Sequence, residues 1–180
     1  MYDVRAIGNW FLDRAEHDDG EQLTAMKLQK LAYVAHGWHL AFQDEPLVHD
    51  AVEAWQWGPV FRSLYREFRD LGSHPIARRA TAFDGGSLED KVISISDYDN
   101  PEAMNQFLEG VWEVYGQYTA GQLSDITHQP GTPWRQMYER MGNQILPYTI
   151  IPNEMIKQHY KKLVDERSRS TSSATTSSAS

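Results

Sequence analysis

The chain has 180 residues, of which 41% are hydrophobic, and it contains 6 Trp, 9 Tyr and 6 Phe. This length fits one domain, and the apolar content is sufficient for a core, which excludes a wholly disordered chain. The net charge of −8 disfavours general nucleic-acid binding, because an acidic surface repels phosphates. The same charge favours a basic partner.

The sequence contains no cysteine, which excludes disulfides, thiolate zinc ligands and thiol catalysis. Its N-terminus lacks the apolar run of a signal peptide, and no stretch is long and apolar enough to span a bilayer. We therefore expect a cytoplasmic protein that makes no membrane contact.

Apolar residues recur at three- and four-residue spacing over residues 3–16 and 25–43, which predicts two amphipathic helices. Thr24 is placed to cap the second of these helices. Gly37 lies inside it, where glycine costs about 1 kcal/mol relative to alanine. This glycine indicates either close packing against another element or a tolerated substitution.

Residues 51–57 alternate with period two, which predicts a short strand with Trp55 and Trp57 on the same face. We expect Gly58-Pro59 to end this strand and to begin a helix, with Val60 in its buried stripe. Tryptophan is enriched both in cores and in binding hot spots, so one of the two tryptophans can be core and the other interface.

In the second half, residues 92–95 are a candidate strand, and helical spacing predicts helices over 101–116 and about 120–127. Thr132 is placed to cap a further helix that has Pro133 as its first residue. Pro152 opens the last helix.

Residues 168–180 are rich in Ser and Thr and carry no large apolar side chain, which predicts a disordered tail. Residues 1–167 are expected to form the domain. The fold class is mainly α: a compact single-domain helical bundle of about six to seven helices with one or two short strands.

Catalytic and metal-binding patterns are weak. His36 and His39 lie three residues apart on one helix, but nothing fixes a third or fourth ligand near them. Ser124, Asp125 and His128 lie within five residues, a spacing that rarely forms a nucleophilic triad. No nucleophile elbow or phosphate-binding glycine motif occurs. We expect no enzyme activity, cofactor or metal, and a metal hydrolase using His36 and His39 is the enzymatic alternative.

Lys27 and Lys30 lie on the second predicted helix. Lys27 can form an anion site with Arg66 or Arg135, or the two lysines can extend along apolar surface with solvated ammonium groups. The candidate partner-binding residues are Trp57, Lys27 and Lys30.

Three segments carry a resemblance to a known family: Met26–Leu31 with Trp38–Leu40, Glu53–Val60, and Leu123–Trp134. In this order they resemble the Panacea domain of SocA-like antitoxins, over about residues 3–165. The matching motif residues are Lys27, Leu28, Gln29, Lys30, Leu31, Trp38, Trp55, Gly58, Pro59, Val60, Leu123, Ser124, Thr127, His128, Pro133 and Trp134.

The resemblance implies a mostly helical bacterial or phage-associated protein without catalysis or cofactor. It implies an antitoxin of a type II toxin–antitoxin system, which neutralises a cognate toxin by direct protein–protein binding. The toxin is expected to be encoded by an adjacent gene. The alternative is a protease adaptor, or another interaction module, that delivers a client protein. The motif residues are expected to maintain the fold rather than to contact the partner.

Overall fold

The computed structural model describes residues 1–18 and 22–176, with only the helical backbone over 170–176. The described residues form seven α-helices and five short strands. The helices are α1 (Val4–His17), α2 (Ala25–Gln43), α3 (Arg62–Phe68), α4 (Pro101–Tyr115), α5 (Ala120–His128), α6 (Pro133–Arg140) and α7 (Asn153–Thr176). The strands are β1 (Val52–Trp55), β2 (Gly58–Phe61), β3 (Thr81–Asp84), β4 (Glu89–Val92) and β5 (Ile150–Ile151). The prediction of a mainly α domain is confirmed, although the strands are more numerous than expected.

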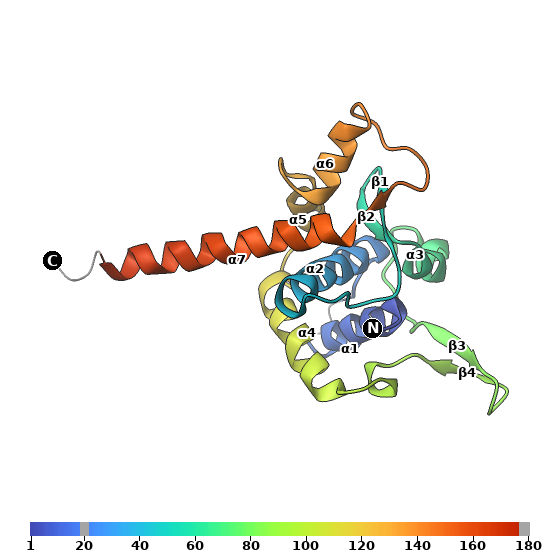
Figure 1. The fold of residues 1–180 in the computed structure, drawn as a ribbon. Coiled ribbons are helices and arrows are strands. Elements are labelled where there is room, and N and C mark those ends of the chain that lie inside the picture. The colour runs from blue at the N-terminus through green and yellow to red at the C-terminus, as the bar shows by residue number, and fades with distance from the viewer. Residues whose placement is uncertain (19–21, 177–180) are drawn as a thin grey trace.

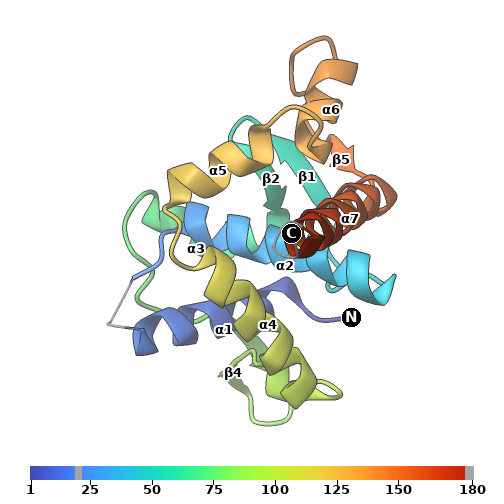
Figure 2. The ribbon, with the colours of Figure 1, turned by 90° about the vertical axis from the view of Figure 1, so that its left-hand side faces the viewer.

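Helix α2 is the central element of the fold (Figures 1 and 2). It packs against α1, α4, α5, α7 and β2, and its side chains are buried without interruption from Lys27 to Trp38. A helix that is buried on all sides must satisfy its polar side chains inside the protein. The predicted helix over 25–43 is confirmed, and the Thr24 hydroxyl caps it by accepting from the Lys27 amide.

Gly37 is the point at which α7 crosses α2. A Cβ atom at this position would collide with the ring of Tyr160 on α7. The same ring lies edge-on to Trp38, with ring centroids 5.0 Å apart. Close packing, rather than tolerance, therefore accounts for this glycine.

Strands β1, β2 and β5 form an antiparallel sheet in the order β2-β1-β5. The register pairs Trp55 with Gly58, so β1 and β2 are joined by the two-residue turn Gln56-Trp57. The predicted strand is confirmed over Val52–Trp55, but the expectation that Gly58-Pro59 begins a helix is wrong. The chain continues as β2, and α3 begins only at Arg62.

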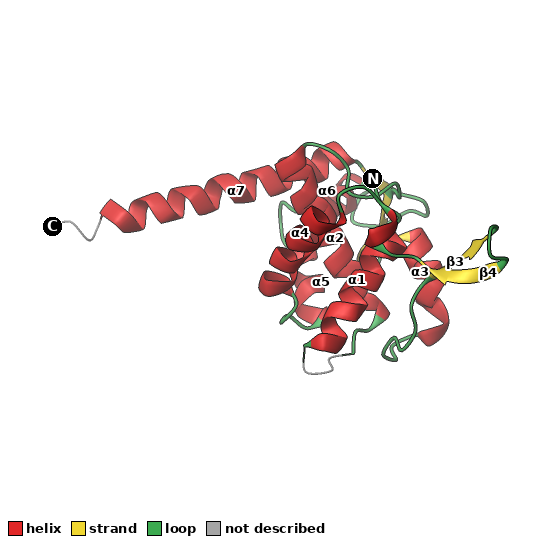
Figure 3. Cartoon of the chain, turned by 90° about the horizontal axis from the view of Figure 1, so that it is seen from below, coloured by secondary structure: helices red, strands yellow, loops and turns green. Residues whose placement is uncertain are grey.

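A second hairpin, β3–β4, projects from the body on the side opposite to the end of α7 (Figure 3). The candidate strand at 92–95 proves to be the end of β4, and Ile95 already begins a 3-10 turn. Strand β3 was not predicted, because its residues are mostly exposed and carry no alternating apolar pattern.

Helix α7 continues past the expected start of the tail at residue 168 and ends at Thr176. Figure 1 shows its C-terminal part extending beyond the other helices. Once a helix is nucleated, each added residue contributes one hydrogen bond without a new nucleation cost, which explains the extension into a Ser/Thr-rich sequence. Residues 177–180 of the expected tail lie outside the described residues, and the domain limit at 167 stays a prediction.

Among the helices described for residues 1–18 and 22–176, none combines the length and apolar character needed to cross a bilayer.

The packing at Gly37 leads to a stability prediction. Gly37→Ala should lower the free energy of unfolding by about 1–3 kcal/mol, because the new methyl group displaces the Tyr160 ring in a packed interior. Gly110→Ala is the matched control, since a Cβ atom there meets nothing within 4 Å and α4 is already helical. It should raise stability by about 0.5–1 kcal/mol. Urea denaturation of both variants checks the pair, and equal stability would contradict the close α2–α7 packing.

Candidate functional site

The three motif segments meet at the β1–β2 hairpin. Helix α2 lies along one side of the hairpin, and α5 and α6 lie along the other (Figure 2). Apart from Trp55, which is half-buried, the large apolar motif residues are buried: Leu28, Leu31, Trp38, Pro59, Val60, Leu123, Pro133 and Trp134. Gln29, Lys30 and Trp134 bind main-chain atoms of the hairpin, and Lys27 binds a main-chain carbonyl outside it.

Gln29 closes the outer edge of strand β2. Its side-chain amide donates to the Phe61 carbonyl at 3.1 Å, and its side-chain oxygen accepts from the Phe61 amide at 2.9 Å. A neighbouring strand would make the same pair of bonds. Pro59, two residues earlier, has no N–H to satisfy. The amide of one helical side chain therefore replaces a fourth strand.

Lys30 fixes the turn of the hairpin. Its ammonium donates to the carbonyls of Trp57, at 2.6 Å, and Pro59, at 3.2 Å. The residue is 1% exposed, and this burial lowers the pKa of Lys30 to about 7. Gly58 has φ +103°, and a Cβ atom there would collide with the Lys30 ammonium. Only glycine allows both the turn and the bound lysine.

Lys27, which is 5% exposed, binds elsewhere on α2. Its ammonium donates to the Gly116 carbonyl at 2.6 Å and lies 5.7 Å from the centre of the Trp112 ring. Lys27 and Lys30 were predicted to bind a partner, and that assignment is corrected here. Both ammonium groups are inside the protein, because unsatisfied main-chain carbonyls require them there.

The turn between α5 and α6 holds the hairpin from the other side. The Trp134 indole donates to the Trp55 carbonyl at 2.7 Å, and the His128 ring lies 3.9 Å from the Trp134 ring, centroid to centroid. His128 Nδ1 donates to the Ser124 carbonyl at 2.6 Å. Because this nitrogen is used by the main chain, Ser124 and His128 are placed as structural neighbours rather than as a nucleophile and its base.

Trp55 and Trp57 have different environments. The Trp55 indole is half-buried and donates to Glu53 at 2.9 Å. Arg62 binds the same carboxylate with two bonds, and this ion pair lowers the pKa of Glu53. Trp57 lies on the turn and is 66% exposed. Trp57 is therefore the solvent-facing member of the pair.

The sequence did not predict the cation–π contacts that Arg62 makes next to Trp55. Arg62 lies over the Trp55 ring and, at 4.8 Å from its centroid, over the ring of Tyr148, an exposed residue with φ +61°. No spacing rule connects residues 53, 62 and 148. The cation–π contacts arise because β5 adds to β1 and brings the preceding loop beside α3.

The two α2 histidines are not brought together as metal ligands. His36 Nε2 donates to the Asn153 side chain at 3.0 Å, and burial lowers the pKa of His36 to about 4. His39 Nδ1 donates to the Glu45 carbonyl at 2.8 Å. Within the described ranges, no group of three or more His, Cys, Asp or Glu side chains is arranged to hold a metal ion.

The hydrogen bond of Trp134 leads to a graded prediction. Trp134→Ala should lower the free energy of unfolding by about 3–5 kcal/mol, because it removes a large buried ring. Trp134→Phe keeps most of the ring but leaves the Trp55 carbonyl without its donor, and it should cost about 1–3 kcal/mol. Chemical denaturation checks both values. Full stability of the alanine variant would contradict the burial of this side chain.

Lys30 leads to a prediction about pH. The folded-state pKa of about 7 lies below the unfolded value of about 10.4, so the unfolded chain binds more protons between these values. This group therefore makes the folded state more stable as pH rises from about 7 to about 10. Lys30→Met loses the two carbonyl contacts at every pH, and its stability deficit should grow across this window. Parallel stability curves for the two proteins would contradict the assignment.

Comparison with known proteins identifies the family to which the three motif segments belong. The family model "Antitoxin SocA-like, Panacea domain" matches residues 28–135, which run from α2 to the start of α6. The chain is 32% identical over 159 residues to Antitoxin SocA from Caulobacter vibrioides (strain NA1000 / CB15N), covering 88% of this chain and 82% of that protein. No solved structure matches. The chain belongs to the SocA-like antitoxin family and contains a Panacea domain.

Proposed function

We propose that this chain is a cytoplasmic antitoxin of a type II toxin–antitoxin system and that it neutralises its toxin by direct protein–protein contact. The family supports an antitoxin role. The observation that carries direct contact is the exposed Trp57 on a hairpin whose backbone is fixed from both sides.

An exposed tryptophan on an ordered turn is well suited to binding. Association normally costs the ordering of loops and side chains, and a pre-organised anchor reduces that cost. Tryptophan is also the residue most enriched among binding hot spots. The Trp57 carbonyl is already bound by Lys30, so the turn is ordered before a partner arrives.

The chemistry of the motif favours binding over catalysis. The motif side chains with polar groups near the hairpin include Gln29, Lys30, Thr127 and His128, and each of these four is bonded to a main-chain atom. They maintain the hairpin and are not arranged around an open substrate site. The net charge of −8 favours a toxin with a basic surface.

The role is tested by co-expression. Each gene adjacent to this one is induced alone and together with this chain, and growth is recorded. We expect one neighbour to be toxic alone and harmless with this chain, and to co-purify with it. If no neighbour is toxic alone and rescued jointly, the proposal fails. The toxin's half-life separates blocking from delivery to a protease, because blocking leaves the half-life unchanged.

The hairpin contact is tested by Trp57→Ala. Because Trp57 is exposed, stability should change by less than about 0.5 kcal/mol. The affinity for the toxin should fall by about 2 kcal/mol, roughly 30-fold, as expected for a hot-spot residue. Phe83→Ala on β3 is the matched control, since Phe83 is 67% exposed and lies on the other hairpin. Titration calorimetry with the purified toxin measures both variants, and equal affinities would exclude Trp57 as the contact.

A further inference from the structure

We infer that the hollow between α4, the α5–α6 turn and α7 is a second contact site for the same partner, and that it binds a segment carrying a large apolar side chain next to a carboxylate. This inference rests on the proposed antitoxin function. It adds the place and the chemistry of recognition.

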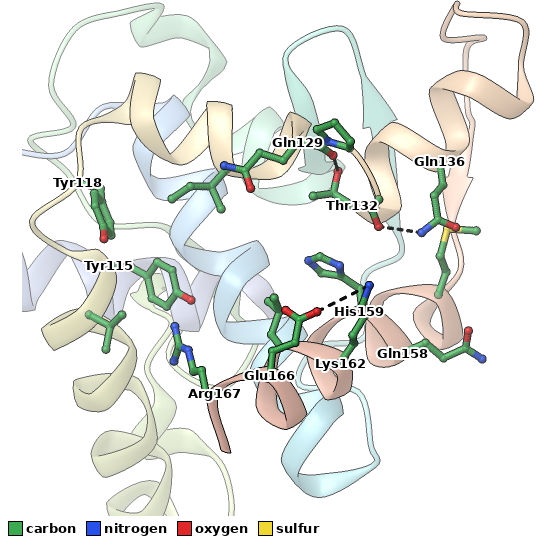
Figure 4. A pocket seen from close by; sticks show the side chains of 16 residues that line it. Tyr115, Tyr118, Gln129, Thr132, Gln136, Gln158, His159, Lys162, Glu166 and Arg167 are labelled. Atoms are coloured by element: carbon green, nitrogen blue, oxygen red, sulfur yellow. Dashed lines mark hydrogen bonds and ion pairs between the residues drawn. The ribbon is translucent and has the colours of Figure 1, made fainter. Parts of the chain in front are cut away.

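The hollow has a volume of about 700 Å³ and three walls (Figure 4). Tyr115 and Tyr118 form the wall at the end of α4. The turn 129–132 forms the second wall, and α7 forms the third from Met155 to Arg167. This volume accommodates a few side chains of a partner, rather than a whole helix or domain.

One wall of the hollow belongs to the family motif but is not buried by the fold. Gln129, Pro130 and Gly131 are exposed, although the residues on either side of them are buried or half-buried. Their main-chain atoms are used locally: the Gln129 carbonyl accepts from Thr132, and the Gly131 carbonyl accepts from Gln136. The exposed side chains of this turn therefore face the hollow without a role in the core.

The floor of the hollow is apolar. Ile126, Met155 and Leu163 are each half-buried and pack against the core from their inner sides. Residues 155, 159 and 163 are spaced by one helical turn, so this face of α7 is aligned along the hollow. A large apolar side chain from a partner would cover these partly exposed groups.

The α7 wall adds positive charge. The titratable side chains that line it are His159, Lys162, Glu166 and Arg167. Lys162 is exposed and lies 3.7 Å from Glu166, a separation longer than that of a close ion pair. Residues 157–169 contain five basic and two acidic residues, whereas residues 1–156 carry a net charge of −11. Of the five basic residues, Lys162 and Arg167 line the hollow, so a partner carboxylate is favoured at this wall relative to the acidic remainder of the chain.

The hollow and the hairpin share one turn of the chain. Thr127 and His128 lie against Gly58 of the hairpin, and the next residues, 129–132, line the hollow. The α5–α6 turn therefore joins the hollow to the hairpin that carries Trp57. The basic surface expected of the partner and its acidic–apolar segment would fix one orientation on this chain.

A toxin-independent experiment tests the chemistry of the hollow. Random linear peptides displayed on phage are selected on the full-length chain and then sequenced. Enriched peptides should carry a large apolar residue within one helical turn of Asp or Glu, and should lose binding to Ile126→Glu. Leu88→Glu is the control, because Leu88 is exposed on the β3–β4 hairpin. No enrichment, or equal binding to both variants, would overturn the inference.

The charge is tested by two substitutions at adjacent residues of α7. Lys162→Glu should weaken the best peptide about tenfold, because it places a carboxylate beside the peptide's own. Lys161→Glu carries the same charge change, but Lys161 binds Asp44 and does not line the hollow. It should leave peptide affinity unchanged, and thermal melting of both variants confirms folding. Equal effects of the two substitutions would contradict the assignment.

Co-expression with the toxin separates this inference from the proposed function. If Ile126→Glu and Lys162→Glu both neutralise the toxin as fully as the wild-type chain, the hollow is not the toxin contact, and the antitoxin role stands. If no neighbouring gene product is neutralised but the selected peptides bind the hollow, the antitoxin role fails, and the recognition chemistry is supported on its own.

Discussion

The structure depends on the closure of a strand edge by side chains of a helix. Strand β2 is an edge strand of the described β2-β1-β5 sheet, and an open strand edge is a template on which another chain can pair. The Gln29 side chain hydrogen-bonds the main-chain amide and carbonyl of Phe61, and the Lys30 ammonium hydrogen-bonds the carbonyls of Trp57 and Pro59. The buried ammonium is costly, as its lowered pKa shows. That cost is offset because two carbonyls would otherwise remain unsatisfied beside a buried helix.

This closure determines what the surface presents. Lys30 holds the hairpin backbone on one side and Trp134 holds it on the other, and the Trp57 side chain at the turn is exposed to solvent. The α5–α6 turn that supplies Trp134 also supplies a wall of the hollow. Lys30 and Trp134, which hold the hairpin backbone, form a frame around it. This frame and the two candidate contact surfaces, Trp57 and the hollow, are thus built around α2 and the hairpin.

Apolar spacing and capping residues predicted the helices well, because both depend only on residues that are close together in the sequence. Thr24 and Thr132 cap the helices that they were expected to cap, and the helix over 101–116 was correct within a residue. Gly58-Pro59 was misread because a glycine followed by a proline also suits a helix start. The strand that follows is completed by the bonds between Gln29 and Phe61, which lie 32 residues apart, and no local pattern indicates this pairing. The sequence placed Lys30 on a helix, but its burial depends on carbonyls that only the fold brings to it.

The bonds that hold the hairpin end on main-chain atoms, and this has a consequence for specificity. Lys30 binds the carbonyl of Trp57 and does not depend on its indole, and Trp134 likewise binds the carbonyl of Trp55. Every residue has a carbonyl, so the frame places no requirement on the side chains at positions 56 and 57, although it requires glycine at 58. The tip can therefore change its side chains without loss of the frame. If the proposed contact at Trp57 holds, this fold separates stability from recognition. Substitutions of the side chains that hold the hairpin should then alter unfolding, and substitutions at the tip should alter the choice of partner.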